Sequence, residues 1–442
     1  MNIQLSDHFT YRKLLRFTLP SIAMMIFTSI YGVVDGYFVS NYVGKTPFAA
    51  VNFIMPFLMI LGTFGFMFGT GGSALVSKTM GEGDMPKANR LFSMLTYISI
   101  GVGLFLTVFG VIFIRPIAAL LGAEGAMLDD CVLYGRINLA ALPFFMLQME
   151  FQSFFVTAEK PQLGLIATVA AGVTNMVLDA LFIAVFRWGI AGAAIATAAS
   201  QVIGGVFPLF YFSRKNTSLL RLTKANFDAN ALLRTCTNGS SELMSNISMS
   251  VVGMLYNTQL MKYAGEDGVA AYGVLMYVNM IFIGAFIGYS IGTAPVIGYH
   301  YGAANRKELR SLLQKSLVII SVFSVCMLIL GELLAKPLSH LFVSYDGALL
   351  ALTLRGFAIF SVSFLFAGIA IFGSGFFTAL NNGLISALIS FLRTLVFQIA
   401  AILILPLIWG TDGIWISVVV AELMAVVVTA AFLIAMRRKY GY

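Results

Sequence analysis

The stretch GTGGSALVSKTMGEGDMPKANR, residues 69–90, has a counterpart half a chain further on in IGTAPVIGYHYGAANRKELR, residues 291–310. A shift of 221 residues aligns Gly81 of the first stretch with Gly302 of the second. The same shift aligns identical residues along most of the chain; examples are Gly32 with Gly253, Tyr42 with Tyr263, Gly71 with Gly292, and Trp188 with Trp409. One offset held over this length indicates an internal duplication, so we expect two similar halves.

The chain is far more apolar than a water-soluble protein. Of its 442 residues, 59% are hydrophobic and 10% are charged, and the mean hydropathy is +0.92, whereas about 25% of residues in soluble domains are charged. Twelve apolar runs reach the roughly 20 residues that a helix needs to cross a bilayer core; they are 14–38, 50–76, 92–114, 132–156, 163–186, 190–213, 232–258, 268–294, 315–335, 352–378, 384–408 and 413–436. Since lipid cannot satisfy an exposed backbone and strand-like alternation is absent, we predict an all-α integral membrane protein with twelve transmembrane helices.

The duplication and the spans together predict the architecture. Each copy holds six spans, an even number, so both copies have the same orientation and form a parallel repeat about an axis along the membrane normal. We expect an N-terminal six-helix lobe over residues 1–212, a cytoplasmic linker over 213–230, and a C-terminal six-helix lobe over 231–442. Two facing lobes suit a transporter that rocks around a central cavity.

The distribution of positive charge predicts the orientation. Nineteen lysines and arginines fall in segments on one side of the expected membrane and five on the other, and the cation-rich side is normally cytoplasmic. We therefore expect a multi-pass protein of the plasma (inner) membrane with both termini in the cytoplasm. The net charge of +8 fits this orientation and contact with anionic lipid, and we expect no nucleic acid partner.

The sequence contains no visible set of catalytic residues. The GKT at 44–46 lacks the upstream glycine of a phosphate-binding loop, and there is no HExxH or GxSxG pattern. The three cysteines are widely spaced, with no CxxC, so neither disulfides nor a zinc site is indicated. We expect neither an enzyme nor a cofactor.

Four polar residues in the first half share one depth in the membrane. At about 1.5 Å per residue, all four lie roughly 10–17 Å below the expected outer surface; they are Asp35, Asn175, Asp179 and Thr197. Two carboxylates, an amide oxygen and a hydroxyl are suitable ligands for a hard cation, and a pair of acids can instead hold a proton. The alternative is that they are ordinary polar contacts between helices.

The two glycine-containing stretches, together with LPSIAMMIFTSIYGVVDGYFV at 19–39, resemble the duplicated fingerprint of the MATE (multidrug and toxic compound extrusion) transporters. The resemblance covers essentially the whole chain. It implies cation-coupled antiport of drugs or other organic cations through two six-helix lobes arranged as a V. It also implies that Asp35, Asn175, Asp179 and Thr197 form the N-terminal-lobe cation site found in one branch of the family, for Na+ or H+.

The second half does not repeat this set of ligands. At the offset of 221, the four positions are occupied by Tyr256, Val396, Ala400 and Val418. None of these supplies a carboxylate, an amide or an aliphatic hydroxyl. The predicted cation site is therefore confined to the first lobe.

A polar stripe runs along the seventh expected span. Glu242, Asn246, Ser250, Gly253 and Asn257 recur at spacings of three or four residues, which places them on one helix face. They are candidates for lining a cavity that holds cationic substrates. A stripe that only packs against another helix is an equal alternative.

Further buried charges need an explanation. Arg393 and Glu422 lie at similar depth in adjacent spans, so we predict an ion pair between them, with Glu242 as the alternative partner. Glu150, with Gln148 nearby, lies toward the cytoplasmic third of the fourth span and is a candidate for lining an inward-facing cavity.

The sequence thus predicts a monomeric antiporter that exports small organic cations in exchange for Na+ or H+. One rival is a flippase of lipid-linked saccharides from the same superfamily, which would need cationic residues for a pyrophosphate; only Arg393 is plainly mid-membrane. A membrane-embedded enzyme is the other rival, and it would need a clustered acid–base or metal set.

Overall fold

The computed structural model describes residues 3–442, and every regular element in that range is a helix. The helices are α1 (Tyr11–Tyr42), α2 (Lys45–Gly81), α3 (Met85–Leu121), α4 (Gly125–Ala140), α5 (Leu142–Thr157), α6 (Pro161–Asp179), α7 (Gly189–Ser213), α8 (Ala229–Gly302), α9 (Arg306–Val343), α10 (Gly347–Phe360), α11 (Phe364–Ala379), α12 (Gly383–Phe391), α13 (Phe397–Trp409) and α14 (Thr411–Tyr440). Three short helical segments join them: η1 (Ala180–Val185), η2 (Ser361–Ser363) and η3 (Leu392–Val396). The predicted all-α fold class is confirmed.

The number of membrane crossings depends on α8. Ten helices, counted through the short joining segments, are long and apolar enough to cross a membrane, and the bent pair α4 and α5 makes eleven. The 74 residues of α8 would extend about 110 Å if straight, but the helix breaks at Gly265, where φ is 64°. Thr235 near its start and Tyr299 near its end both contact α2, at Gly71 and Gly81. α8 therefore crosses twice, which gives twelve crossings in the described chain.

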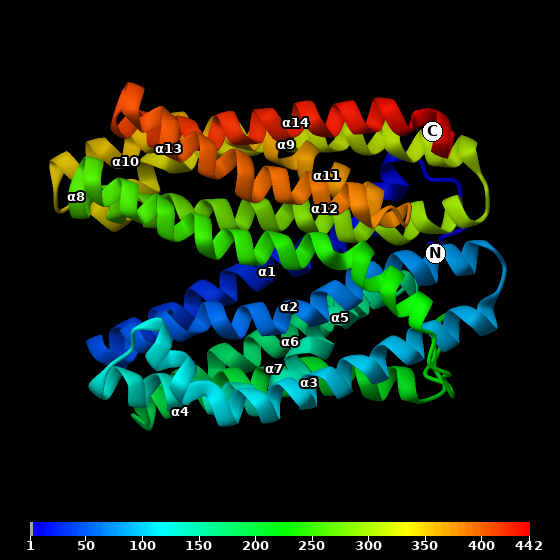
Figure 1. Ribbon diagram of the computed structural model, residues 1–442, viewed down its shortest axis with the longest axis horizontal. Coiled ribbons are helices and arrows are strands. Elements are labelled where there is room, and N and C mark those ends of the chain that lie inside the picture. The colour runs from blue at the N-terminus through cyan, green and yellow to red at the C-terminus, as the bar shows by residue number, and fades with distance from the viewer. Residues whose placement is uncertain (1–2) are drawn as a thin grey trace.

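The helices form two lobes of six crossings each. α1 to α7 make up one lobe, here the N-lobe, and α8 to α14 make up the C-lobe (Figure 1). Both chain termini lie at the same end of the molecule, and the lobes draw together toward that end (Figure 1). We call this the closed end and the opposite end the open end.

The lobes share one hydrophobic core at the closed end and have separate cores at the open end. Phe154 of the N-lobe and Phe286 of the C-lobe belong to one continuous buried cluster, which also contains Leu5 and Tyr442 near the chain termini. The buried residues of a second cluster all belong to the N-lobe, although Leu232, Cys236 and Leu243 of α8 pack against it, and a third cluster, built around Trp415, lies entirely in the C-lobe. Apolar burial therefore holds the lobes together mainly at the closed end.

Gly81 and Gly302, aligned by the internal repeat, allow α2 and α8 to approach very closely. A Cβ at Gly81 would collide with the carbonyl oxygen of Tyr299, and a Cβ at Gly302 would collide with that of Lys78. Only a hydrogen atom fits at either position, so the two helices pack backbone to backbone. The duplicated glycines of the sequence thus form reciprocal contacts between the two halves.

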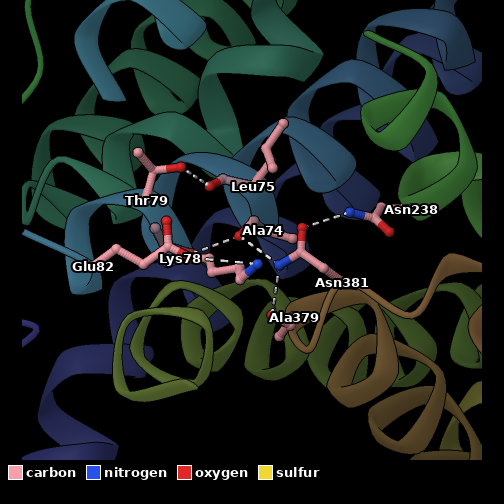
Figure 2. Close-up of polar contacts among 9 residues, drawn as sticks. Ala74, Leu75, Lys78, Thr79, Glu82, Asn238, Ala379 and Asn381 are labelled. Atoms are coloured by element: carbon pink, nitrogen blue, oxygen red, sulfur yellow. Dashed lines mark hydrogen bonds and ion pairs between the residues drawn. The ribbon is translucent and has the colours of Figure 1, made fainter. Parts of the chain in front are cut away.

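Asn381 adds a polar connection between the lobes at the closed end (Figure 2). Its Nδ2 donates to the carbonyl oxygen of Ala74 on α2 at 3.0 Å, and its Oδ1 accepts from Nδ2 of Asn238 on α8 at 2.8 Å. Asn381 has a φ of 57°, a left-handed conformation that asparagine tolerates better than most residues. The turn between α11 and α12 thereby fixes α2 against the C-lobe.

The N-terminal segment Leu5–Phe9 also joins the lobes. The Leu5 N–H donates to Oε1 of Glu159 in the N-lobe at 2.6 Å, and the Phe9 N–H donates to Oε1 of Glu308 in the C-lobe at 2.9 Å. His8 Nδ1 lies 2.6 Å from the other oxygen of Glu308. Leu5 and Phe9 are fully buried, and burial raises the pKa of the Glu159 carboxyl above its ordinary value. The segment therefore closes the space between the lobes at this end.

We expect Gly302→Ala to destabilise the closed end, because the new methyl group must push α8 away from the Lys78 carbonyl. Overpacking of this kind costs about 1–3 kcal/mol, so the melting temperature of the protein purified in detergent should fall. Gly253→Ala is the matched control, since no atom lies within 4 Å of a Cβ there. Equal melting temperatures for the two variants would contradict the proposed contact.

Candidate functional site

The four side chains predicted to bind a cation all lie within the N-lobe. They come from three helices: Asp35 from α1, Asn175 and Asp179 from α6, and Thr197 from α7. Asp179 is fully buried, and Asn175 is 2% exposed. Asp179 is also the last residue of α6, and the π-helical segment η1 follows it at once. Such wider helical turns occur frequently at functional sites, because they disturb the regular backbone hydrogen bonds.

The packing of α1 on α6 brings the two acids together. The Tyr31 ring of α1 lies against Gly172 of α6. Asp35 follows Tyr31 by one helical turn, and Asn175 follows Gly172 by about one turn, so these groups lie at one level. The Asp35 and Asp179 carboxyls are close enough to interact with each other.

The oxygens of this cluster lack hydrogen-bond donors. In the described structure, five buried side-chain oxygens of this cluster have no hydrogen-bond partner; they are Oδ1 of Asp35, Oδ1 of Asn175, Oδ1 and Oδ2 of Asp179, and Oγ1 of Thr197. Buried polar atoms are nearly always paired, so a group of orphaned oxygens requires an explanation. Carboxylate, amide and hydroxyl oxygens have the chemistry of a hard-cation site, and two adjacent acids can equally share a proton. The residues present fit a small cation.

Two residues of α4 complete the surroundings of this cluster, and the sequence analysis missed both. The Tyr134 side chain lies near Thr197, Asn138 and both acids, and its hydroxyl donates to Sδ of Met55 at 3.8 Å. Tyr134 is fully buried, and Asn138 is 6% exposed. Their spacing of four residues just before Pro143 was a usable signal, because it places two polar groups on one helix face.

A small cavity adjoins the cluster. Asn138, Thr197 and Gln201 supply its polar lining, and it is large enough to hold one water molecule. Oε1 of Gln201 is buried without a hydrogen-bond partner in the described structure. A single water molecule therefore fits beside Thr197.

The polar stripe of α8 faces the N-lobe. Gly239 packs directly on α2, and Glu242, Asn246, Gly253 and Asn257 continue the same helix face toward the open end. The Asn246 side chain donates to the carbonyl oxygen of Glu242 at 2.9 Å, within the same helix. Gly253 has no atom within 4 Å of its Cβ position, and Asn257 is exposed. The outer part of the stripe therefore borders open space and makes no tight helix contact.

Arg393 and Glu422 form an ion pair with two hydrogen bonds. Nε and Nη2 of Arg393 donate to the two carboxylate oxygens at 2.8 and 3.0 Å. Their side chains are 14% and 7% exposed, and Glu242 lies close enough to feel the same positive charge. The pair joins η3 to α14 within the C-lobe.

Glu150 and Gln148 do not border the space between the lobes. Glu150 is fully buried inside the N-lobe, where Oε1 accepts a hydrogen bond from Oγ1 of Thr96 on α3 at 3.4 Å. Gln148 is 5% exposed and lies against Gly204 of α7. The expectation that these residues line an inward-facing cavity does not match this position, because the helix face of α5 that carries each one is covered by other N-lobe helices.

Comparison with known families gives one decisive match. The MatE family model matches residues 20–181 and again residues 243–404. The chain belongs to the MATE family. The two matched segments correspond to the two lobes, so the internal repeat is a property of the family model as well.

Curated relatives of this MATE protein are similar over nearly the whole chain. The multidrug export protein MepA of Staphylococcus haemolyticus (strain JCSC1435) is 27% identical over 414 residues, which cover 93% of this chain and 90% of that protein. MepA of Staphylococcus saprophyticus is 25% identical over 93% of this chain and 91% of its own length. These relatives are named as export proteins, so the chain belongs to a family of transporters.

Solved structures of the family share the fold. A multidrug resistance MATE family transporter of the MOP superfamily, described as outward-facing, has a TM-score of 0.93 and 22% identity, with 100% of this chain and 98% of that chain covered. A crystal structure of MATE in complex with MaL6 has a TM-score of 0.91 and 22% identity, with coverage of 98% and 97%.

We expect Glu422→Gln to destabilise the MATE protein, because it leaves the mostly buried Arg393 without a full counter-charge. Breaking a buried pair in this way costs about 3–5 kcal/mol, which should appear as a lower melting temperature in detergent. The double variant Arg393→Met with Glu422→Leu should recover much of the loss, since no unpaired charge remains. Full stability of the single variant would show that Glu242 or lipid replaces the partner.

Proposed function

We propose that this MATE protein is an antiporter in which inward movement of Na+ or H+ drives the export of small organic cations or drugs by alternating access. The orphaned oxygens around Asp35 and Asp179 carry the proposal. Two neighbouring acids inside a membrane lobe are costly unless they bind a cation or a proton. No lysine or arginine forms an ion pair with either acid within residues 3–442.

The position of α1 explains how an ion could act on both lobes. One part of α1 packs on the C-lobe, where Ile22 lies against Gly288 of α8 and Oγ of Ser29 donates to the Met280 carbonyl at 3.2 Å. Asp35, further along α1, faces α6 of the N-lobe. A cation between the two acids removes their repulsion and draws α1 toward α6. A bound cation therefore changes how tightly α1 packs on the C-lobe, because α1 contacts both lobes.

The expected cycle follows from this bias. An ion enters from outside and binds at Asp35 and Asp179, which favours outward release of the substrate, and the ion leaves after the lobes reopen toward the cytoplasm. One charge that moves with a potential of 100 mV gains about 2.3 kcal/mol. This corresponds to roughly fortyfold accumulation, at about 1.4 kcal/mol per factor of ten. A single ion per cycle is therefore a useful driving force. We propose no cofactor besides the coupling ion.

The α8 stripe is the proposed substrate-facing surface. Glu242 supplies an acid for a cationic group, and Asn246 and Asn257 supply neutral polar contacts on the same face. The relatives named as multidrug export proteins support small-molecule substrates. We propose a monomer in the plasma membrane, with the closed end and both termini on the cytoplasmic side.

The saccharide flippase is not favoured. Such a transporter needs cavity cations that hold a pyrophosphate, and the mid-membrane Arg393 is already engaged by Glu422. The family match and the multidrug export relatives also favour drug transport.

We expect Asp35→Asn to abolish gradient-driven transport, because asparagine can neither release a proton nor compensate the charge of a bound Na+. The measurement uses proteoliposomes loaded with a fluorescent organic cation, under separate Na+ and pH gradients. Asp267→Asn, which changes an exposed acid, should behave as the unmodified protein. Unchanged coupling in Asp35→Asn would make this acid structural and would overturn the proposal.

Binding of Na+ should also be visible without transport. A ligand at a hundred times its dissociation constant stabilises a protein by about 2.7 kcal/mol, so saturating NaCl should raise the melting temperature relative to choline chloride. The shift should disappear in Asp179→Asn. Persistence of the shift in that variant would place the Na+ elsewhere, and absence of a shift in the unmodified protein would identify H+ as the coupling ion.

A further inference from the structure

The N-lobe contains a third buried acid that the proposed cycle does not use. Glu150 lies in the middle of α5 and is fully buried. Oε1 accepts from Oγ1 of Thr96 at 3.4 Å, and the Ser99 side chain, about one turn further along α3, lies near the carboxyl. Oε2 of Glu150 and Oγ of Ser99 have no hydrogen-bond partner in the described structure. Because Oγ1 of Thr96 also donates to the Phe92 carbonyl oxygen at 3.0 Å, the Glu150 carboxyl is only weakly hydrogen-bonded.

No charge compensates Glu150. None of the ion pairs formed by residues 3–442 includes it, and neither a cationic side chain nor another acid lies close enough to influence it. The hydroxyls of Thr96 and Ser99, both on α3, lie near its carboxyl. An acid in such a place is costly to insert into a membrane, and acids of this kind usually serve a function.

Glu150 lies between the proposed cation site and the closed end. It precedes the end of α5 by seven residues, or about 10 Å, whereas Asp179 is 18 residues, or about 27 Å, from the start of α6. Both of these helix ends meet at the turn around Glu159, at the closed end. Glu150 is thus roughly 17 Å nearer to that end than Asp179.

Polar side chains connect the two levels. Gln148 on α5 lies near Tyr31, which is one turn from Asp35. One turn beyond Gln148, both polar atoms of the Gln152 amide are buried without a partner. Gln148 and Gln152 also line a small cavity with Thr168, which is large enough to hold one water molecule. The interior of the N-lobe therefore offers polar groups along the way from Asp35 to the level of Glu150.

We propose that Glu150, with Thr96 and Ser99, is a second station for the coupling cation, occupied after the ion leaves Asp35 and Asp179 and before it reaches the cytoplasm. This inference rests on the proposed function. If the ion is H+, the Glu150 carboxylate takes up one proton from the first site through water and gives it to water at the closed end. If the ion is Na+, the carboxylate and the two hydroxyls supply its oxygen ligands.

Glu150→Gln is the decisive variant, because glutamine has the shape of the protonated acid and can still hydrogen-bond to Thr96 and Ser99. A purely structural acid would tolerate this change. A cation station would not, so we expect coupled transport in proteoliposomes to fall at least tenfold while the melting temperature stays unchanged. Separate pH and Na+ gradients identify which ion the station carries, and Glu124→Gln, an exposed acid, is the control.

Infrared difference spectra between pH 5 and pH 9, with and without Na+, supply a readout besides transport. The unmodified protein should show a carboxyl band that changes with pH or Na+ and that Glu150→Gln lacks. Wild-type transport and an unaltered band in Glu150→Gln would overturn the inference while leaving the proposed function intact, provided that Asp35→Asn abolishes coupling. Unchanged coupling in Asp35→Asn would instead overturn the proposed function.

Ser99→Ala serves as a second variant in case Glu150→Gln does not fold. This substitution removes the serine hydroxyl near the Glu150 carboxyl and leaves the acid itself in place. We expect the pH midpoint or the apparent Na+ affinity of transport to shift at least threefold. An unchanged midpoint and affinity would count against the station.

Discussion

The contact between α2 and α8 at the closed end determines how the two lobes relate to each other. Gly81 and Gly302 allow backbone-to-backbone packing there, and one hydrophobic core extends through both lobes around this contact. At the open end each lobe has its own core. Since the lobes share buried surface mainly at the closed end, separating them there is the main energetic requirement for a change of access. Asn381 and the N-terminal segment add hydrogen bonds that must break in the same step.

The two lobes have the same topology but different interiors. The N-lobe places three acids in its interior, Asp35, Glu150 and Asp179, and pairs none of them with a cation in the described structure. The C-lobe instead pairs Arg393 with Glu422 and fills the position equivalent to Asp35 with Tyr256, whose hydroxyl donates to Gln398 at 2.8 Å. The C-lobe thus pairs its mid-membrane arginine with an acid and carries Glu242 on its α8 stripe, whereas the N-lobe retains three interior acids that can respond to ions. After duplication, the two copies kept the fold and separated these two roles.

Much of the fold could be predicted from sequence because its determinants are local. Span length, hydropathy and a single repeat offset identify helices, their number and the two halves without any knowledge of contacts. The level shared by Asp35 and Asp179 also follows from counting residues along regular helices.

Prediction from sequence failed where a contact between side chains depends on how the helices rotate and pack. Tyr134 lies near the acids, and Asn138 lies near Thr197, because α4 packs against α7, and Glu150 turns toward α3, away from the space between the lobes. The irregular turn after Asp179 has no clear signal in composition.

The attachment of Leu5–Phe9 has a consequence for the order of assembly. This segment is made first, but its partner Glu308 lies about 300 residues later in the chain, and domains emerging from the ribosome fold in order of synthesis. The first lobe can therefore insert and pack, with Leu5 on Glu159, while His8 and Phe9 still lack their partner in the C-lobe. The closed end is completed only after α9 has been synthesised, so the junction between the lobes forms late in folding, after much of each lobe is in place.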